Sequence, residues 1–194
     1  MQKLTEKDLY SLEAYAEVRP VFRAKVLNHK KNRKLAIGPH ATLYFEDRLT
    51  IQYQIQEMLR VERIFEPEAI RGELDAYNPL IPDGQNLKAT FMLEYDDPDE
   101  RKAALARLKG IEHRVWMAVE GFESLWAITD EDLARENAEK TSAVHFLRFE
   151  LSSQMAVAAK SDAGLSFGIE HAEYRHKVQS VPASIRRSLA GDLD

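Results

Sequence analysis

The chain has 194 residues, no cysteine, 30% charged residues and a formal net charge of −5. Without cysteine it has no disulfide, no thiolate nucleophile and no cysteine-bound iron–sulfur cluster, so a metal ion would need His, Asp or Glu ligands. The N-terminal segment is charged and lacks the apolar core of a signal peptide, and no apolar run approaches the roughly 20 residues of a membrane span. We therefore expect a cytoplasmic globular protein that does not associate with a membrane.

Charge is distributed unevenly along the chain. Residues 1–40 contain nine Lys and Arg against four Asp and Glu, a net charge of +5, whereas the remainder carries −10. The overall acidity disfavours nucleic acid as a partner, and the opposite charges of the two regions would suit docking onto a protein or self-association as a homodimer. Because there is no linker or repeat, we expect one domain over 1–194, with a helical part at about 1–80 and a sheet-rich part at about 87–194.

The first part of the chain carries helix signals. Thr5 can cap a short helix, and a longer helix is predicted from Pro20, a residue tolerated at the first helical position, to the basic run at 30–34. Pro67 begins another predicted helix, which ends near residue 77, before a loop rich in proline.

The segment 49–56 is ambiguous. Its apolar residues alternate with Thr and Gln, which is typical of a strand, but the run continues into good helix formers after a capping residue, Asp47. We favour one helix over 48–64. On that helix, four apolar residues would form one buried stripe: Ile51, Ile55, Met58 and Leu59.

From residue 87 the apolar period changes to two, which predicts strands. The expected extended segments are 35–37, 41–45, 87–95, 115–119, 125–128, 143–151, 165–169 and 174–181, and the expected helices are 97–110, 131–139 and 182–189. Short connections between successive strands favour antiparallel pairing. The predicted fold class is α+β, with a helical N-terminal third packed on a mostly antiparallel sheet of about five to six strands and a C-terminal helix.

Several stretches carry a resemblance to a known family: Gly38-Pro39-His40, Phe45-Glu46, the run 54–64, Glu73-Leu74 with Tyr77-Asn78, the run 142–149 and the segment 189–193. Over nearly the whole chain they resemble an uncharacterised bacterial family, the domain of unknown function numbered three-five-zero-one. Genes of this family often lie near those of rubrerythrin and an iron–sulfur oxidoreductase. The resemblance therefore implies an accessory role in redox or peroxide metabolism, with such a protein as partner, and it supplies no catalytic residues.

Glu62 would lie in the middle of the apolar stripe of the 48–64 helix. A carboxylate there is costly unless it is paired or ligated. It can form a buried ion pair, with Arg48, Arg60 or Arg71 as the partner, or it can bind a metal ion or transfer a proton.

His145 shares a strand face with apolar residues, and His171 extends the apolar face of the strand at 165–169. If both faces point inward, the two imidazoles and Glu62 would supply the two-histidine, one-carboxylate ligand set of iron or manganese. The alternative is two independent histidines that are hydrogen-bonded to the backbone, because strand alternation fixes a face and not a distance.

The basic segment that runs into Gly38-Pro39-His40 offers a candidate anion site: Arg23, Lys30, Arg33 and His40. The alternative is a solvated helix end. No phosphate-binding loop or G-x-S-x-G elbow occurs. Trp116 and Trp126 are interpreted as core or sheet-face residues, because no basic and aromatic residues alternate around them.

Three functions remain open from the sequence. The first is a non-catalytic accessory protein in a redox system, which binds a rubrerythrin-like or iron–sulfur partner. The second is a metal-dependent enzyme or metal-binding protein that uses Glu62, His145 and His171 with a divalent ion such as iron or manganese. The third is a small-anion-binding domain.

Overall fold

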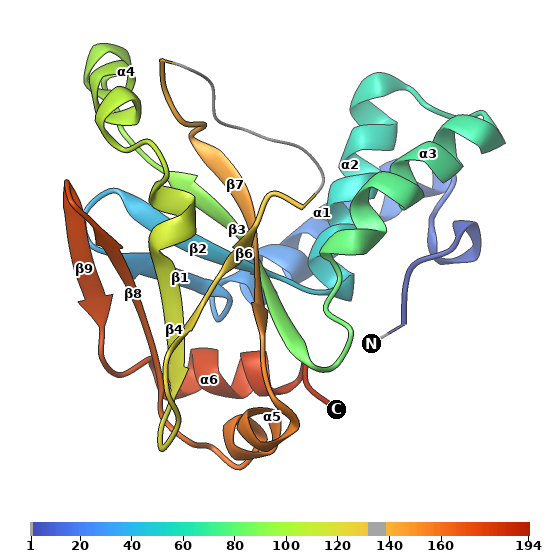
Figure 1. Ribbon diagram of the computed structural model, residues 1–194. Helices are drawn as coiled ribbons and strands as arrows, with labels where there is room; N and C mark the ends of the chain where they lie inside the picture. Colours follow the sequence, from blue (N-terminus) through green and yellow to red (C-terminus); the bar gives the residue numbers. More distant parts are fainter. Residues whose placement is uncertain (1, 132–138) are drawn as a thin grey trace.

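The computed structural model describes residues 2–131 and 139–194, and Figure 1 shows how its helices and strands are arranged. The helical elements are η1 (Glu6–Asp8), α1 (Leu12–Lys30), α2 (Arg48–Glu62), α3 (Pro67–Tyr77), η2 (Asn78–Leu80), α4 (Pro98–Arg107), η3 (Ile111–Arg114), α5 (Ser153–Lys160) and α6 (Ala183–Ala190). The strands are β1 (Lys34–Ile37), β2 (Ala41–Glu46), β3 (Asn86–Leu93), β4 (Val115–Val119), β5 (Leu125–Trp126), β6 (Ile128–Thr129), β7 (Val144–Glu150), β8 (Leu165–His171) and β9 (Tyr174–Val178). The α+β class is therefore confirmed.

The strands form two antiparallel sheets where one was expected. One sheet has five strands in the order β1-β2-β3-β7-β6, and the other has four in the order β5-β4-β8-β9. Apolar residues of both sheets share one core, in which the rings of Phe45 and Phe149 each contact Phe167 at centroid distances of 5.3 and 5.4 Å. The alternation identified most strand segments, but it does not state which segments pair, and so the division into two sheets was not predicted.

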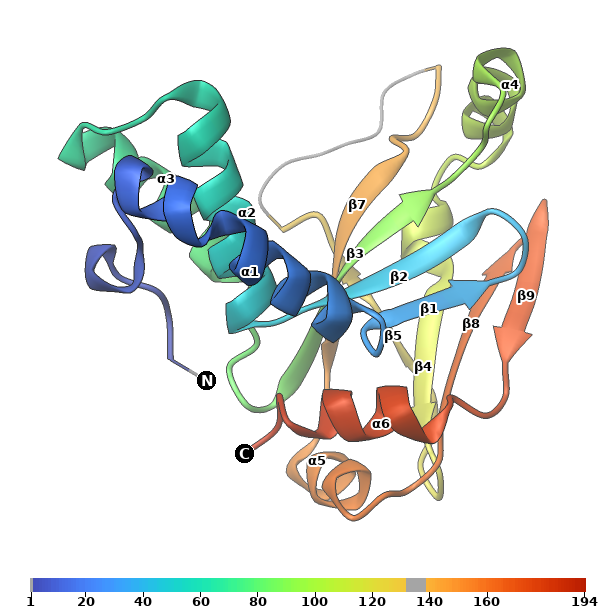
Figure 2. The same ribbon diagram turned by 180° about the vertical axis from the view of Figure 1, so that it is seen from behind.

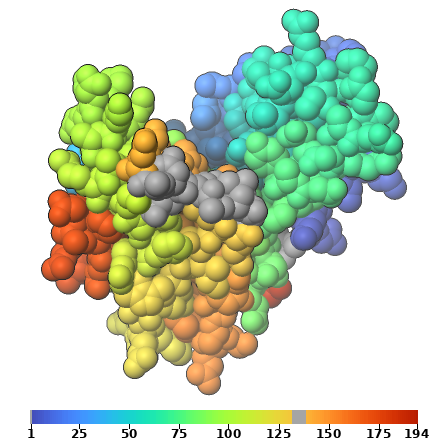
Figure 3. Space-filling model, turned by 45° about the horizontal axis from the view of Figure 1, so that its top comes forward, coloured from blue at the N-terminus to red at the C-terminus, as the bar shows by residue number. Residues whose placement is uncertain are grey.

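Helices α1, α2 and α3 form a separate lobe at one side of the sheets (Figures 1 and 2). This helical lobe has its own apolar clusters, one around Ile51, Ile55 and Leu59 and one around Tyr15, Phe22 and Val26. The remaining helices lie around the sheets: α4 at one end, and α5 and α6 at the other, where α6 runs below the strands. Figure 3 shows a recess between helix α4 and the helical lobe.

The ambiguous segment 49–56 is helical, as favoured. Asp47 caps α2 by accepting a hydrogen bond from the amide of Thr50, and Arg63 ends the helix in the left-handed conformation. The predicted start of one helix at Pro20 was wrong, and one further helix was missed. Helix α1 begins at Leu12 after a Ser11 cap, with Pro20 inside it, and α5 was not predicted. The helix expected at 131–139 lies mainly outside the described residues.

Helix α1 continues through Pro20 because its packing compensates for the missing amide. Tyr15, Phe22 and Val26, which lie on both sides of the proline, are all buried in one cluster with α2. A proline removes one backbone hydrogen bond and costs about 3 kcal/mol, which is comparable to the burial of one or two large apolar side chains. Within the described residues, no helix combines the length and the apolar character needed to cross a membrane.

Candidate functional site

His145 lies at the centre of a buried polar cluster. Strand β7 pairs with β3 so that His145 stands opposite Phe91, and its side chain points into the apolar core with an exposed fraction of 0%. This is the inward face that the alternation of the strand predicted. An imidazole at such a position needs hydrogen-bond partners on both ring nitrogens, or its burial is costly.

Asp130 holds one side of the His145 ring. Its Oδ2 lies 2.5 Å from the ring Nδ1, and its Oδ1 accepts a hydrogen bond of 3.0 Å from the amide of Phe146. Asp130 follows the short strand β6 and has a φ of 44°, a left-handed conformation that Asp tolerates better than most residues. The carboxylate therefore fixes the orientation of the imidazole and directs Nε2 to the opposite side.

Three oxygen atoms surround Nε2 of His145. They are the Thr141 hydroxyl at 2.9 Å, the Ser142 carbonyl at 3.1 Å and the Glu112 carboxylate at 3.7 Å. The Thr141 hydroxyl also lies 3.2 Å from the Glu112 carboxylate. Glu112 belongs to η3, which follows the left-handed Gly110, and its exposed fraction is only 3%. We call the five residues Glu112, Asp130, Thr141, Ser142 and His145 the His145 centre.

The His145 centre has the donor groups of a metal site. Among the described residues, ligand atoms of Glu112, Asp130 and His145 all lie within 4.8 Å of one another. Carboxylates and an imidazole together suit divalent iron, manganese or zinc. The Asp–His–Thr order also has the connectivity of a catalytic triad. However, the Thr141 hydroxyl belongs to a residue with an exposed fraction of 1%, so a substrate could not reach it in this conformation.

Of the three metal ligands predicted from the sequence, only His145 lies in this cluster. Glu62 is exposed at the C-terminal end of α2, because the buried stripe of that helix ends at Leu59, and the last turn extends past its neighbours. The arginines expected to pair with Glu62 have other partners: Arg48 pairs with Asp8, Arg60 with Glu57 and Arg71 with Glu6.

His171 has a different and local role. Its Nε2 donates to the carbonyl of Lys109 at 3.0 Å, and its Nδ1 accepts from the amide of Glu173 at 3.2 Å. Both ring nitrogens are thus used to attach the turn between β8 and β9 to the segment before η3. This matches the alternative reading of a backbone-bonded histidine, and the predicted set of Glu62, His145 and His171 is not brought together.

The predicted anion site is also dispersed, chiefly because Arg33 is buried. Its guanidinium donates to the carbonyls of Phe45 and Glu46 and contacts the carboxylate of Asp192 at 2.5 Å and that of Asp47 at 3.4 Å. His29 lies 2.5 Å from the same Asp47 carboxylate. We call Arg33, Asp47, Asp192 and His29 the Arg33 network. It connects the end of α1, strand β2 and the C-terminal segment, and it leaves no guanidinium edge for a soluble anion.

The other three residues of that set lie apart from Arg33. Arg23 is exposed on α1, and the Lys30 ammonium lies 5.9 Å from the centre of the Tyr53 ring. His40, at the far end of the β1–β2 hairpin, stacks on Tyr95 at a centroid distance of 4.1 Å. Strand β1 carries His40 away from the end of α1, because an extended chain advances about 3.3 Å per residue.

The sequence reasoning missed Glu112, Asp130, Thr141 and Ser142. They lie in a 3₁₀ turn and in loop segments, where no apolar period marks which side chains face inward. The one available signal was Gly110, an expected helix-capping residue that redirects the chain just before Glu112.

The geometry defines an α+β protein with a two-sheet core, a helical lobe and a buried His–carboxylate centre. A family model for a protein of unknown function (DUF3501) matches residues 3–193. The chain therefore belongs to this DUF3501 family, as its motifs indicated. A crystal structure of a novel protein of unknown function from Burkholderia pseudomallei K96243 is 52% identical, with a TM-score of 0.95 and 100% coverage of both chains. No curated protein matches the chain.

Proposed function

We propose that this protein binds one divalent metal ion, manganese or iron(II), at the His145 centre. One observation carries the proposal. The Glu112 carboxylate is buried and faces Nε2 of His145 at 3.7 Å, and within the described part of the chain no Lys or Arg side chain pairs with it. A buried carboxylate without a fixed cation is expensive, and a bound metal ion would supply the missing positive charge.

The spacing of the donor atoms supports this assignment. Nε2 of His145 lies 2.9 Å from the Thr141 hydroxyl, 3.1 Å from the Ser142 carbonyl and 3.7 Å from the Glu112 carboxylate. The Thr141 hydroxyl lies 3.2 Å from the same carboxylate. Ligands that each lie about 2.1 Å from one ion are about 3.0 Å apart in an octahedron and about 3.4 Å apart in a tetrahedron. Asp130, bonded to Nδ1, would then act as the carboxylate that orients a metal-binding histidine.

The burial of the centre favours an accessory role over catalysis. His145, Thr141 and Glu112 have exposed fractions of 0%, 1% and 3%, so a metal ion held there would have no open position for a substrate. Because the chain has no cysteine, it cannot itself perform thiol chemistry or hold a cysteine-bound cluster. We therefore propose that it serves redox or peroxide metabolism beside a partner, as a metal-holding accessory protein.

Elemental analysis tests the metal assignment. Protein purified without a chelator, from cells grown with manganese and iron, is expected to contain about one of these ions per chain. The variant His145→Gln, checked for folding by circular dichroism, is expected to lose it. The control His176→Ala removes an exposed histidine on β9 and is expected to retain it. Metal far below one ion per chain in the unmodified protein, or full occupancy in His145→Gln, would overturn the proposal.

The accessory role has a separate test. A tagged copy of the chain at native abundance is expected to co-purify with a rubrerythrin-like or iron–sulfur protein. Recovery of the tagged chain without either protein would contradict this role and leave the metal assignment to the elemental analysis.

A further inference from the structure

A second feature lies on the outer face of the four-stranded sheet, on the side that does not face the core. The strand registers place four residues in one row across β5, β4, β8 and β9: Trp126, Trp116, Gly168 and Lys177. The flanking residues of β4, Val115 and Met117, are fully buried, so the alternation of that strand directs Trp116 outward. The row therefore presents two indole rings beside a cation.

Gly168 is what allows Trp116 to lie flat on this face. A Cβ atom added to Gly168 would lie 2.4 Å from the six-membered part of the Trp116 indole. Any other residue would push the ring away from the strand, because real side chains do not approach so closely. The indole covers Gly168, which is buried although it faces outward, and Trp116 itself is only half-buried.

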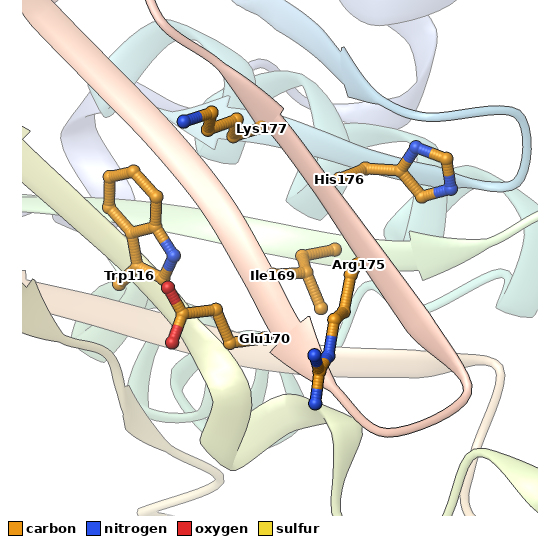
Figure 4. Close-up of a pocket in the computed structure, with 6 residues that line it drawn as sticks. All are labelled: Trp116, Ile169, Glu170, Arg175, His176 and Lys177. Atoms are coloured by element: carbon orange, nitrogen blue, oxygen red, sulfur yellow. The ribbon is translucent and has the colours of Figure 1, made fainter.

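Two cationic side chains lie near the Trp116 indole on this face. Lys177 stands opposite Gly168 in the row, and Arg175 stands opposite Glu170 one pair further along the hairpin. In the described part of the chain, neither cationic side chain takes part in an ion pair or hydrogen bond. Figure 4 shows Lys177 extending toward Trp116, with Glu170 beside the indole, whereas His176 points the other way. The depression that they line has a volume of about 520 Å³.

We propose that this face binds a mononucleotide, with the base stacked on Trp116 and the phosphate held by Lys177 and Arg175. A flat indole at the floor of a shallow site favours a planar ring, and base stacking on an aromatic side chain contributes about 1–3 kcal/mol. Unpaired Lys and Arg side chains favour an anion attached to that ring. The volume matches a ligand of this size. A nucleic-acid strand fits less well, because the net charge of −5 would repel its other phosphates.

This site is independent of the His145 centre and was hidden in the sequence. Trp116 and the two cations are separated by about 60 residues in the chain, and only the antiparallel pairing of β4, β8 and β9 brings them onto one face. The interpretation of Trp116 as a plain sheet-face residue rested on the absence of nearby basic residues in the sequence.

Fluorescence titration of the full-length protein tests the site. AMP is expected to quench the tryptophan emission saturably. Adenosine, which lacks the phosphate, and ribose 5-phosphate, which lacks the base, are each expected to bind at least about tenfold more weakly. Equal binding of ribose 5-phosphate and AMP would remove the stacking role, and the absence of saturable quenching by AMP at millimolar concentration would overturn the proposal.

Variants locate the binding, with calorimetry as the readout. Trp116→Leu and Lys177→Glu are expected to weaken AMP binding about tenfold or more. The control Lys31→Glu makes the same charge change on an exposed residue after α1 and is expected to bind AMP like the unmodified protein. Equal affinity in Lys177→Glu and Lys31→Glu would refute the site. Tighter binding of a short single-stranded oligonucleotide than of AMP would replace the proposed ligand with a nucleic-acid strand.

Discussion

The Arg33 network and the His145 centre are both buried polar clusters that contain a histidine and two carboxylates, but their charge balance differs. In the Arg33 network, a guanidinium with a 1% exposed side chain lies within 4.0 Å of the carboxylates of Asp47 and Asp192. In the His145 centre, the Glu112 carboxylate approaches two imidazole nitrogens and the Thr141 hydroxyl, and within the described residues no Lys or Arg side chain pairs with it. The first cluster contains its own cation, whereas no Lys or Arg of the described residues pairs with Glu112 in the second.

From this difference we infer a structural role for the Arg33 network and propose a binding role for the His145 centre. Arg33 lowers the pKa of Asp47 below its usual value although burial opposes it, and burial raises the pKa of Asp192 to about 6 although Arg33 opposes it. Such a complete network connects three parts of the chain and needs no ligand. A buried carboxylate beside an oriented imidazole, without Lys or Arg, is the arrangement that a metal ion completes.

The largest expected effect follows from removal of the cation in the complete network. Arg33→Met keeps most of the buried stem and leaves two buried carboxylates uncompensated, so we expect the free energy of unfolding to fall by about 3–5 kcal/mol. The control Arg23→Met, on the exposed face of α1, is expected to change it by less than about 0.5 kcal/mol. Urea denaturation measures both.

The loss of stability in Arg33→Met is expected to depend on pH. A carboxyl whose folded pKa is raised stabilises the fold at low pH, and this contribution is lost as the pH rises through the folded pKa. The pKa of Asp192 is already raised to about 6, and loss of Arg33 raises it further. The deficit of Arg33→Met is therefore expected to be smaller at pH 5 than at pH 8. An equal deficit at both pH values would contradict the assigned charge balance.

The His145 centre is expected to respond in the opposite way. Glu112→Gln removes a buried charge that no Lys or Arg of the described residues pairs with, so in chelator-treated protein its stability should equal or exceed that of the unmodified chain. Manganese at about 100 times its Kd should stabilise the unmodified chain by about 2.7 kcal/mol, which raises Tm by about 5–10 °C. Glu112→Gln should show no such rise, and the exposed control Glu68→Gln should show all of it. A metal response in Glu112→Gln would contradict the assignment.

A smaller effect is expected at Asp130, which contacts the ring and not the proposed ion. In Asp130→Asn, an amide group facing Nδ1 would favour the ring tautomer with its proton on Nε2, where the ion should bind. We expect metal affinity to fall about 10- to 100-fold without being lost, measured by calorimetry with manganese. Complete loss of binding would instead identify Asp130 as a direct ligand.

The two clusters also show what the sequence could predict and what it could not. The inward direction of His145 follows from the alternation of its strand, and the helix over 48–64 follows from its Asp47 cap and helix formers. By contrast, Glu62 was wrongly assigned to a buried face. The helical period shows which face of α2 is apolar, but it does not show how far along the helix that face is covered by neighbouring residues. Arg33 was a candidate anion ligand or a solvated cation in a basic run, and the return of the C-terminal segment with Asp192 helps to bury it.

Long-range pairing accounts for the other differences. Nothing in the local pattern shows that β6 pairs with β7 and so delivers Asp130 to His145, or that β8 lies between β4 and β9. A period of two is the same for either sheet, so the chain could be divided into strands but not into two sheets. The candidate centre was therefore predictable at one of its five residues.

The smallest expected effect concerns a charge cluster that is only partly buried, between α1 and α2. The hydrogen bond from Arg19, assisted by those from Tyr15 and Arg60, lowers the pKa of Glu57 to about 2. A carboxyl with a lowered folded pKa stabilises the fold above its unfolded pKa, and this contribution is lost as the pH falls toward the folded value. Because the Arg19 side chain is 33% exposed, solvent reduces the contribution to about 1 kcal/mol.

Glu57→Gln is therefore expected to be about 1 kcal/mol less stable than the unmodified protein at pH 7, and the gap should close as the pH falls from about 4.5 toward 2. Urea denaturation across this pH range measures the gap, and Glu13→Gln, exposed in the first turn of α1, serves as the control. A gap that stays constant with pH would mean that Glu57 contributes through packing and not through its charge. A gap that closes at low pH would instead show that the Glu57 charge itself stabilises the fold. That contribution is smaller than the contribution of Arg33, because water can solvate the partly exposed Glu57 pair but not the buried Arg33 network.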